Sequence, residues 1–310
     1  MGLISELKKP STIDLQGRTT HLNGLQRFVD DFLTSHTGYS SEFYLQIDHY
    51  CPLEQPLMRK GDVGMLCFER LNNVQFVKKY LERINEALEV DGYCMVRVET
   101  KDSRRVRILK KFPKIISRPY YAMDFVLKRL FPKWGPTKRV YFWLTKGKNR
   151  VISLTEALGR LVSCGFDIVA YQRVGYDTFI IGKKVRDPHY DMEATFGMLV
   201  YLNRIGLHGK EFIVYKLRTM YPYSEYLQDY IFKKNNLQHG GKIKDDFRIS
   251  GYGRIFRKLW IDELPMIYNW LKGDMKLVGV RPLSKQYYSL YPEDVKKLRI
   301  HVKPGLVPPF

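Results

Sequence analysis

The sequence predicts an α/β protein whose first part is built on a parallel sheet. Three apolar segments, at residues 43–47, 64–68 and 93–98, have the length and composition of strands. Between the second and third segments, residues 73–88 place apolar side chains at the three- and four-residue spacing of an amphipathic helix. A strand, a helix and a strand in that order form a βαβ unit, whose strands run parallel.

Further elements are expected on both sides of this unit. Apolar spacing over residues 25–32 predicts a short helix ahead of the first strand. Ser153 is a suitable cap for a helix over residues 154–164, because its hydroxyl can accept a free backbone N–H of the first turn. A hairpin over residues 166–184 follows, and the polar, proline-containing residues 185–194 are the expected domain linker.

Residues 110–148 combine many aromatic rings with many Lys and Arg side chains. A helix over residues 122–131 would place Met123, Val126 and Leu127 near one face. This composition suits a membrane interface, where rings lie at headgroup depth and cations meet anionic lipids. It also suits a cap that packs its rings against its own sheet. Because amphipathic stripes usually lie in a core, packing is the preferred interpretation.

Composition limits the partners of the chain. Its 310 residues carry a net charge of +20, which favours nucleic acid, nucleotide phosphates or an anionic membrane surface. No nucleic-acid motif is recognisable, so nucleic acid is not an expected partner. There is no secretory signal and no apolar run of the roughly 18 residues that a transmembrane helix needs, so peripheral or monotopic membrane contact is expected. Four widely spaced cysteines predict reduced thiols.

From about residue 43 to 184, the order of elements resembles the second half of a class I methyltransferase, which has a Rossmann-like fold. A cofactor-binding strand and its Gly-rich turn should come first, but the first half contains no G-x-G pattern. The resemblance is to the fold pattern alone. It implies that residues 1–186 form a degenerate methyltransferase-like domain with a structural or docking role, and adenosylmethionine binding is the less favoured alternative.

Basic residues are grouped in the last third of the chain. Lys216 and Arg218 are two positions apart on a predicted strand, so both should project from one face and could hold a diphosphate. Arg254 and Arg257 have helical spacing and form a cationic face that leads to a pair of acids. A lone Lys-x-Arg pair is more often a solvated strand edge.

The acids are Asp262 and Glu263, which precede Pro265. By itself this dipeptide is most often a helix cap and first-turn acid. Further along, Arg281 stands at a corner fixed by Pro282, where a guanidinium could clamp two phosphate oxygens. Three further short motifs complete the set: Gly273-Asp274-Met275, Gly279-Val280-Arg281-Pro282 and Val302-Lys303-Pro304-Gly305.

In this order and spacing, the motifs resemble those of the bacterial sugar transferases, the monotopic phosphoglycosyl transferases. The resemblance implies that residues 187–310 form a smaller α+β phosphoglycosyl transferase core. The family continues beyond its Lys-Pro-Gly motif, so a truncated carboxyl terminus is one expectation. The predicted chain is therefore a Rossmann-like α/β domain followed by this core.

The resemblance implies an enzyme that transfers a sugar-1-phosphate from a nucleoside diphosphate sugar, with a UDP-sugar as the expected donor, to polyprenyl phosphate. Asp262 would be the nucleophile that forms a covalent phosphosugar intermediate, and Glu263 would bind Mg²⁺ together with Asp262. The product begins a surface polysaccharide or glycoconjugate at the cytoplasmic face of the bacterial inner membrane. The expected substrate-binding residues are Lys216, Arg218, Arg254, Arg257 and Arg281.

This chain also departs from the family pattern. Trp260, Met266 and Val280 replace the usual Ser, Gln and first Pro of the motifs. The family enters the membrane by a re-entrant apolar helix just before the core, and here the methyltransferase-like domain stands in that place. A non-catalytic membrane-surface scaffold that retains the fold is therefore the alternative to the enzyme.

Overall fold

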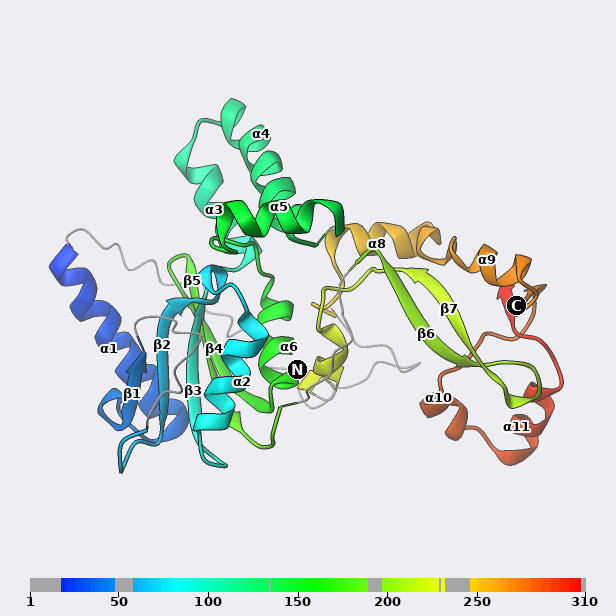
Figure 1. Cartoon of the computed structure of the whole chain (residues 1–310), viewed down its shortest axis with the longest axis horizontal. Helices are drawn as coiled ribbons and strands as arrows, with labels where there is room; N and C mark the ends of the chain where they lie inside the picture. The colour runs from blue at the N-terminus through cyan, green and yellow to red at the C-terminus, as the bar shows by residue number, and fades with distance from the viewer. Residues whose placement is uncertain are drawn as a thin grey trace, which may run out of the picture. The chain divides into compact units, whose positions relative to one another are not determined.

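The computed structural model divides the chain into two compact units (Figure 1). Residues 1–195 and 222–244 form the first unit, and residues 196–221 and 245–310 form the second. The predicted domain boundary after residue 186 lies close to this division and stays a prediction. The structure describes residues 18–47, 58–133, 135–188, 197–228, 230–231 and 246–307, so most of the predicted linker lies outside the described residues.

A five-stranded sheet of order β1-β2-β3-β5-β4 forms the centre of the first unit. As predicted, β1 (Tyr44–Ile47), β2 (Gly64–Arg70) and β3 (Tyr93–Val98) run parallel. However, β5 (Asp177–Lys184) lies between β3 and β4 (Phe166–Val174) and is antiparallel to both. The expectation of a parallel sheet is therefore wrong for this half, because a tight hairpin must reverse the chain and its second strand inserts beside β3. The sheet is mixed.

Three helices pack around this sheet at places close to those predicted. Helix α1 (Arg18–Thr37) is longer than expected, and its Phe32 packs in a cluster with Met95 and Phe179. Helix α2 (Val77–Ala87) starts later than expected, because the residues before it form a 3-10 turn at Leu71–Asn73. Helix α6 (Leu154–Ser163) begins as predicted at Ser153, whose Oγ accepts the Glu156 N–H at 3.2 Å.

The basic aromatic segment is helical throughout most of its length. It begins in the last two residues of α3 (Lys101–Lys111) and contains α4 (Lys114–Phe125), a π-helical turn at Val126–Leu130, a 3-10 turn at Phe131–Lys133 and α5 (Gly135–Thr145). The predicted helix over residues 122–131 is thus the end of α4 and the turn after it. Packing of its apolar face in a core is wrong, because Met123, Val126 and Leu127 are exposed.

The second unit is an α+β structure with two small sheets. Antiparallel β6 (Leu199–Ile205) and β7 (Glu211–Leu217) form one, and parallel β8 (Lys276–Val278) and β9 (Gly305–Val307) form the other. Its small core joins Val214 of β7 to Met266 and Met275. The helices of this unit are α8 (Gly251–Lys258), α9 (Met266–Leu271), α10 (Lys285–Ser289) and α11 (Glu293–Ile300).

Among the described residues, no helix has both the length and the apolar character needed to cross a bilayer.

Buried thiols yield a first prediction. Cys67, Cys94 and Cys164 are free and buried, and burial raises the pKa of the Cys67 and Cys164 thiols to about 12. With Cys51 replaced by Ala, we expect Ellman's reagent at pH 8 to label the native chain about a thousandfold more slowly than the urea-unfolded chain, because the thiolate is the reactive form. One thiol per chain reacting at the unfolded rate would contradict this prediction.

Candidate active site

Two cations converge on one carboxylate in the second unit. Lys216 lies near the end of β7, and its Nζ donates to Glu263 Oε1 at 2.6 Å. Arg281 Nη2 donates to the same oxygen at 2.9 Å. The Glu263 side chain is only 15% exposed and Lys216 is 19% exposed, so this ion pair is partly shielded from water, whereas the Arg281 side chain is 64% exposed. The structure therefore brings together three of the predicted site residues.

Asp262 precedes Glu263 in a 3-10 turn at Ile261–Glu263. Trp260, just before this turn, has a left-handed backbone with φ 58°, which redirects the chain after α8. Pro265 then stands at the start of α9, as predicted. Asp262 is half-buried, and within the described part of the chain it takes part in no ion pair or hydrogen bond. A carboxylate in this state can act on a ligand.

The cationic helix α8 is held against the end of β7 by its amino-terminal cap. Ser250 Oγ accepts the Gly253 N–H at 3.0 Å and donates to Thr219 O at 2.9 Å. A side chain at Gly253 would clash, since its Cβ would lie 2.0 Å from the same carbonyl oxygen. Arg257 Nε donates to Thr219 Oγ1 at 2.9 Å, and the Arg254 side chain is exposed.

Arg218 makes a different contact from Lys216. It lies one residue past the end of β7, and its Nε donates to Gly197 O at 3.0 Å. Strand alternation no longer fixes its direction there. The expectation that Lys216 and Arg218 together hold a diphosphate stays a prediction.

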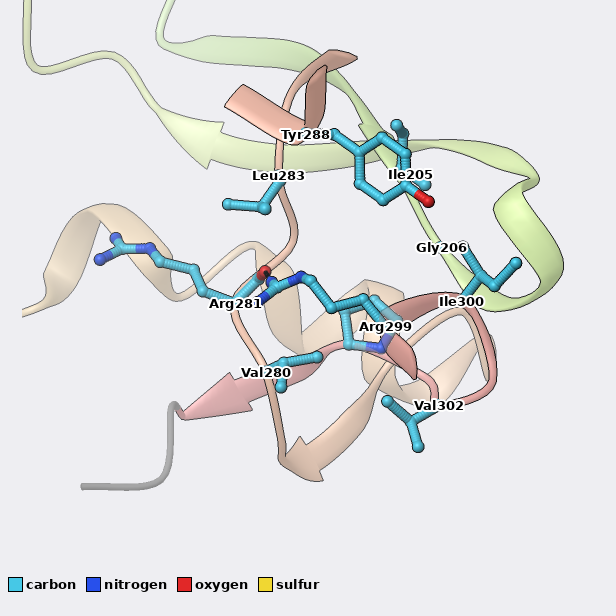
Figure 2. Close-up of a pocket in the computed structure, with 10 residues that line it drawn as sticks. Ile205, Gly206, Val280, Arg281, Leu283, Tyr288, Arg299, Ile300 and Val302 are labelled. Atoms are coloured by element: carbon cyan, nitrogen blue, oxygen red, sulfur yellow. Dashed lines mark hydrogen bonds between the residues drawn. The ribbon is translucent and has the colours of Figure 1, made fainter. Parts of the chain in front are cut away.

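The corner at Arg281 is held from the other side by α11. Arg299 Nη2 donates to Arg281 O at 2.6 Å, and Figure 2 shows the Arg299 side chain directed at this backbone. Burial, and then the charge of Arg281, lowers the pKa of Arg204. A pocket opens beside the corner, with walls from Ile205, Gly206, Val280, Leu283, Tyr288, Ile300, Val302 and Pro304.

Sequence reasoning missed Asn269, which is fully buried in α9. Its Oδ1 accepts the Tyr215 N–H at 3.1 Å, and its Nδ2 donates to Ile213 O at 2.6 Å. These bonds fix α9 against β7, the strand that carries Lys216. The available signal was a polar amide three residues after Met266 on the buried face of a short helix, where Asn is normally unfavourable.

The acid pair is compatible with Mg²⁺. Both cations bind Oε1 of Glu263, and within the described residues its Oε2 and the Asp262 carboxylate have no partner. Among those residues no group of three or more His, Cys, Asp or Glu could form a complete metal cage. Mg²⁺ is commonly held by one or two carboxylates together with substrate phosphates, and these two acids fit that arrangement.

Comparison with known proteins gives a family match for the carboxyl-terminal part of the chain. Residues 191–309 match the model of the bacterial sugar transferase family, which confirms the predicted resemblance for this region. An uncharacterized sugar transferase of Bacillus subtilis, EpsL, is 48% identical over 104 residues, which are 33% of this chain and 45% of that protein.

Two further relatives carry more specific names. The undecaprenyl-phosphate galactose phosphotransferase of Salmonella typhimurium is 40% identical over 33% of this chain and 22% of its own length. The UDP-glucose:undecaprenyl-phosphate glucose-1-phosphate transferase of Xanthomonas campestris is 35% identical over 33% of this chain and 20% of its own. The chain thus spans less than half the length of each of these curated relatives.

The solved structures that resemble the chain do not identify the fold of the first unit. An O-methyltransferase family protein from Burkholderia thailandensis is similar with a TM-score of 0.25 and 11% identity, over 40% of this chain and 30% of that one. This similarity is too low to assign a fold. The methyltransferase-like nature of the first unit stays a prediction.

Proposed function

We propose that the chain is a glycosyl-1-phosphate transferase, which moves a sugar-1-phosphate from a nucleoside diphosphate sugar to polyprenyl phosphate. The family match of residues 191–309 supports this proposal, as do relatives named for transfer to undecaprenyl phosphate. A UDP-sugar is the proposed donor, because one of these relatives is named for UDP-glucose. The lipid acceptor places the reaction at a membrane surface, and we propose the cytoplasmic face of the bacterial inner membrane.

One observation carries the proposal: the Asp262 carboxylate, which has no partner among the residues that the structure describes, lies next to a carboxylate that two cations hold. Phosphate oxygens normally repel an approaching carboxylate nucleophile. Lys216 and Arg281, which bind Glu263 at 2.6 and 2.9 Å, supply positive charge beside Asp262 that offsets this repulsion. The exposed Arg254 and Arg257 on α8 would add to the positive field that attracts a diphosphate.

In the proposed first step, an Asp262 carboxylate oxygen attacks the β-phosphorus of the donor. The bond from that phosphorus to the bridging oxygen breaks, and nucleoside monophosphate leaves with the oxygen. An acyl phosphate that carries the sugar remains on Asp262. In the second step, a phosphate oxygen of polyprenyl phosphate attacks the same phosphorus, which releases Asp262 as a carboxylate and gives polyprenyl diphosphate sugar.

Within these steps, Glu263 keeps Lys216 and Arg281 side by side, and Arg281 is the proposed clamp on a phosphate oxygen. Asp262 and Glu263 would hold Mg²⁺, which would supply positive charge to neutralise the phosphates. Asn269 holds α9 on β7 and so keeps the acid turn opposite Lys216.

The proposal is tested by incubating the chain with a panel of nucleotide sugars, with and without polyprenyl phosphate. We expect one donor to release nucleoside monophosphate and, without acceptor, to leave a phosphosugar adduct visible by intact mass. Addition of polyprenyl phosphate should discharge the adduct. A chain that neither releases nucleotide nor gains mass with any donor would instead be the non-catalytic membrane-surface scaffold.

A further inference from the structure

Helix α4 has its apolar side turned outward. Ile116, Tyr120, Met123 and Leu127 follow each other at spacings of four, three and four residues, so they form one stripe along the helix and the turn after it. All four are exposed, and Ile116 and Met123 are each 53% exposed. Ile115, beside this stripe, is 89% exposed. In water such a helix normally presents its polar side.

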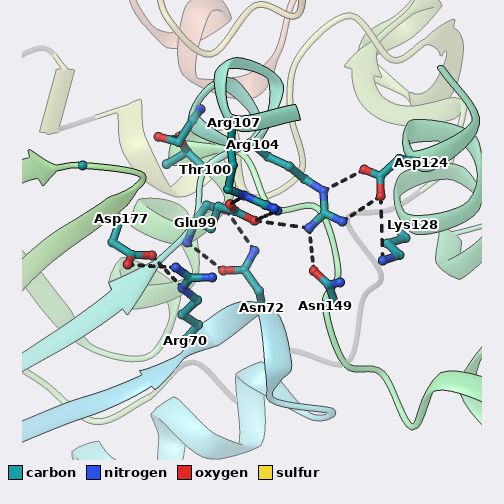
Figure 3. A network of polar contacts seen from close by, with 12 residues as sticks. Arg70, Asn72, Glu99, Thr100, Arg104, Arg107, Asp124, Lys128, Asn149 and Asp177 are labelled. Atoms are coloured by element: carbon teal, nitrogen blue, oxygen red, sulfur yellow. Dashed lines mark hydrogen bonds and ion pairs between the residues drawn. The ribbon is translucent and has the colours of Figure 1, made fainter. Parts of the chain in front are cut away.

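The polar side of the same helix faces the protein. Ser117 and Asp124 are buried, and Asp124 is only 5% exposed. Figure 3 shows Asp124 bound by Arg104 of α3, whose Nε and Nη2 each donate to one carboxylate oxygen at 2.7 Å. Lys128 contributes a further contact to Asp124 at 3.7 Å. This buried ion pair fixes the rotation of α4, so the apolar stripe cannot turn inward without breaking it.

Charge around the stripe is almost entirely positive. Residues 110–148 contain eleven Lys and Arg and a single acid, and that acid is the buried Asp124. The exposed cations include Lys111, Lys114 and Arg118, next to or within α4. Helix α5 adds an exposed Trp143, at 78%, with Arg139 on the same helix. Apolar side chains with an amphipathic Trp and surrounding cations match an anionic lipid surface.

We infer that the outward stripe of α4 (Ile116, Tyr120, Met123 and Leu127) is a docking surface for an anionic phospholipid bilayer. The stripe enters the boundary between headgroups and acyl chains, and the cations meet lipid phosphates. The complementary charge selects lipid over a neutral protein partner, and the fixed rotation of α4 keeps the stripe available. The inference deepens the proposed function, since a polyprenyl phosphate acceptor lies in a membrane, but its test needs no turnover.

The test is flotation of the full chain with vesicles of phosphatidylcholine, with or without phosphatidylglycerol. Wild type should bind the anionic vesicles at least about tenfold more tightly than the neutral ones, and salt should weaken the binding. The Ile116→Glu/Met123→Glu variant should lose at least about tenfold in affinity for anionic vesicles. The matched control is Val90→Glu/Val185→Glu, which adds the same charge at exposed apolar positions of the same unit and should bind like wild type.

Folding and catalysis are measured separately from vesicle binding. The stripe residues are exposed and lie outside the proposed catalytic residues, so the variant should keep the wild-type melting temperature and donor-only nucleotide release. If wild type released no nucleotide but bound anionic vesicles through the stripe, only the proposed function would fail. Equal binding of variant and wild type, or of neutral and anionic vesicles, would overturn the docking inference. So would a dimer in lipid-free sedimentation that the variant abolishes, because a second copy would then cover the stripe.

Discussion

The Asp262→Asn variant is expected to release no nucleoside monophosphate and to form no phosphosugar adduct. An amide oxygen is a poor nucleophile and cannot give the acyl phosphate, so we expect a loss of at least about a thousandfold in the first step. Because Asp262 has no partner among the described residues, the substitution should leave folding intact. Single-turnover release of nucleotide, together with intact mass, measures both outcomes.

Two further variants define what this loss means. Asp294→Asn makes the same change at an exposed acid on α11 and should keep full activity. Glu263→Gln keeps the side chain's shape but removes the charge between Lys216 and Arg281, so adduct formation should slow without being abolished. If the Asp262→Asn chain formed the phosphosugar adduct at the wild-type rate, Asp262 would not be the nucleophile, and Glu263 would become the candidate.

Local patterns in the sequence predicted much of the first unit. The positions of β1, β2, β3, the β4–β5 hairpin and α6 follow from apolar periodicity, turn residues and the Ser153 cap, all of which act within a few residues. The mixed sheet could not be predicted this way. Whether β5 pairs with β4 alone or also with β3 depends on contacts between strands about 80 residues apart, such as Val96 with Ile180.

Helix α4 shows the limit of periodicity most clearly. The spacing of Met123 and Val126 indicated an apolar face, and such faces usually pack in a core, so packing was the prediction. Its real direction depends on Asp124, which pairs with Arg104 twenty residues earlier in the chain. A stripe in a sequence defines two faces but does not say which one meets water. The buried ion pair of Arg104 and Asp124 determines which face of α4 is exposed, and no local sequence pattern predicts that pair.

The candidate site was predicted from the order and spacing of several motifs. Local patterns could not predict it, because Lys216 and Glu263 are 47 residues apart in the sequence. Three of the predicted residues, Lys216, Glu263 and Arg281, meet in the structure. Arg218 contacts the Gly197 carbonyl instead, because β7 ends one residue before it and strand alternation no longer fixes the direction of its side chain. Asn269 was not predicted, because the motifs of a site do not indicate which side chains hold its helices and strands together.

A second large effect is expected from breaking the buried pair of Arg104 and Asp124. Their side chains are 3% and 5% exposed. Arg104→Met would leave the Asp124 carboxylate buried with only the distant Lys128 amine, and such an uncompensated charge typically costs about 3–5 kcal/mol of unfolding free energy. Asp124→Leu should cost less, because Arg104 keeps Glu99 at 3.2 Å and Asn149 at 2.6 Å.

Arg104→Met should therefore lose more unfolding free energy than Asp124→Leu. Arg104→Met/Asp124→Leu removes both charges and should recover most of the stability that Arg104→Met loses, since Glu99 still has Arg107. The measurement is urea denaturation followed by tryptophan fluorescence. A Trp260→Phe/Trp270→Phe background removes the tryptophans of the second unit, so the signal comes from the first unit alone. Asp102→Leu, at an acid whose side chain is 75% exposed, is the control and should change little. A double variant as unstable as Arg104→Met would mean that the pair does more than neutralise charge, and that α4 is held in its outward-facing rotation by the geometry of the Arg104 guanidinium itself.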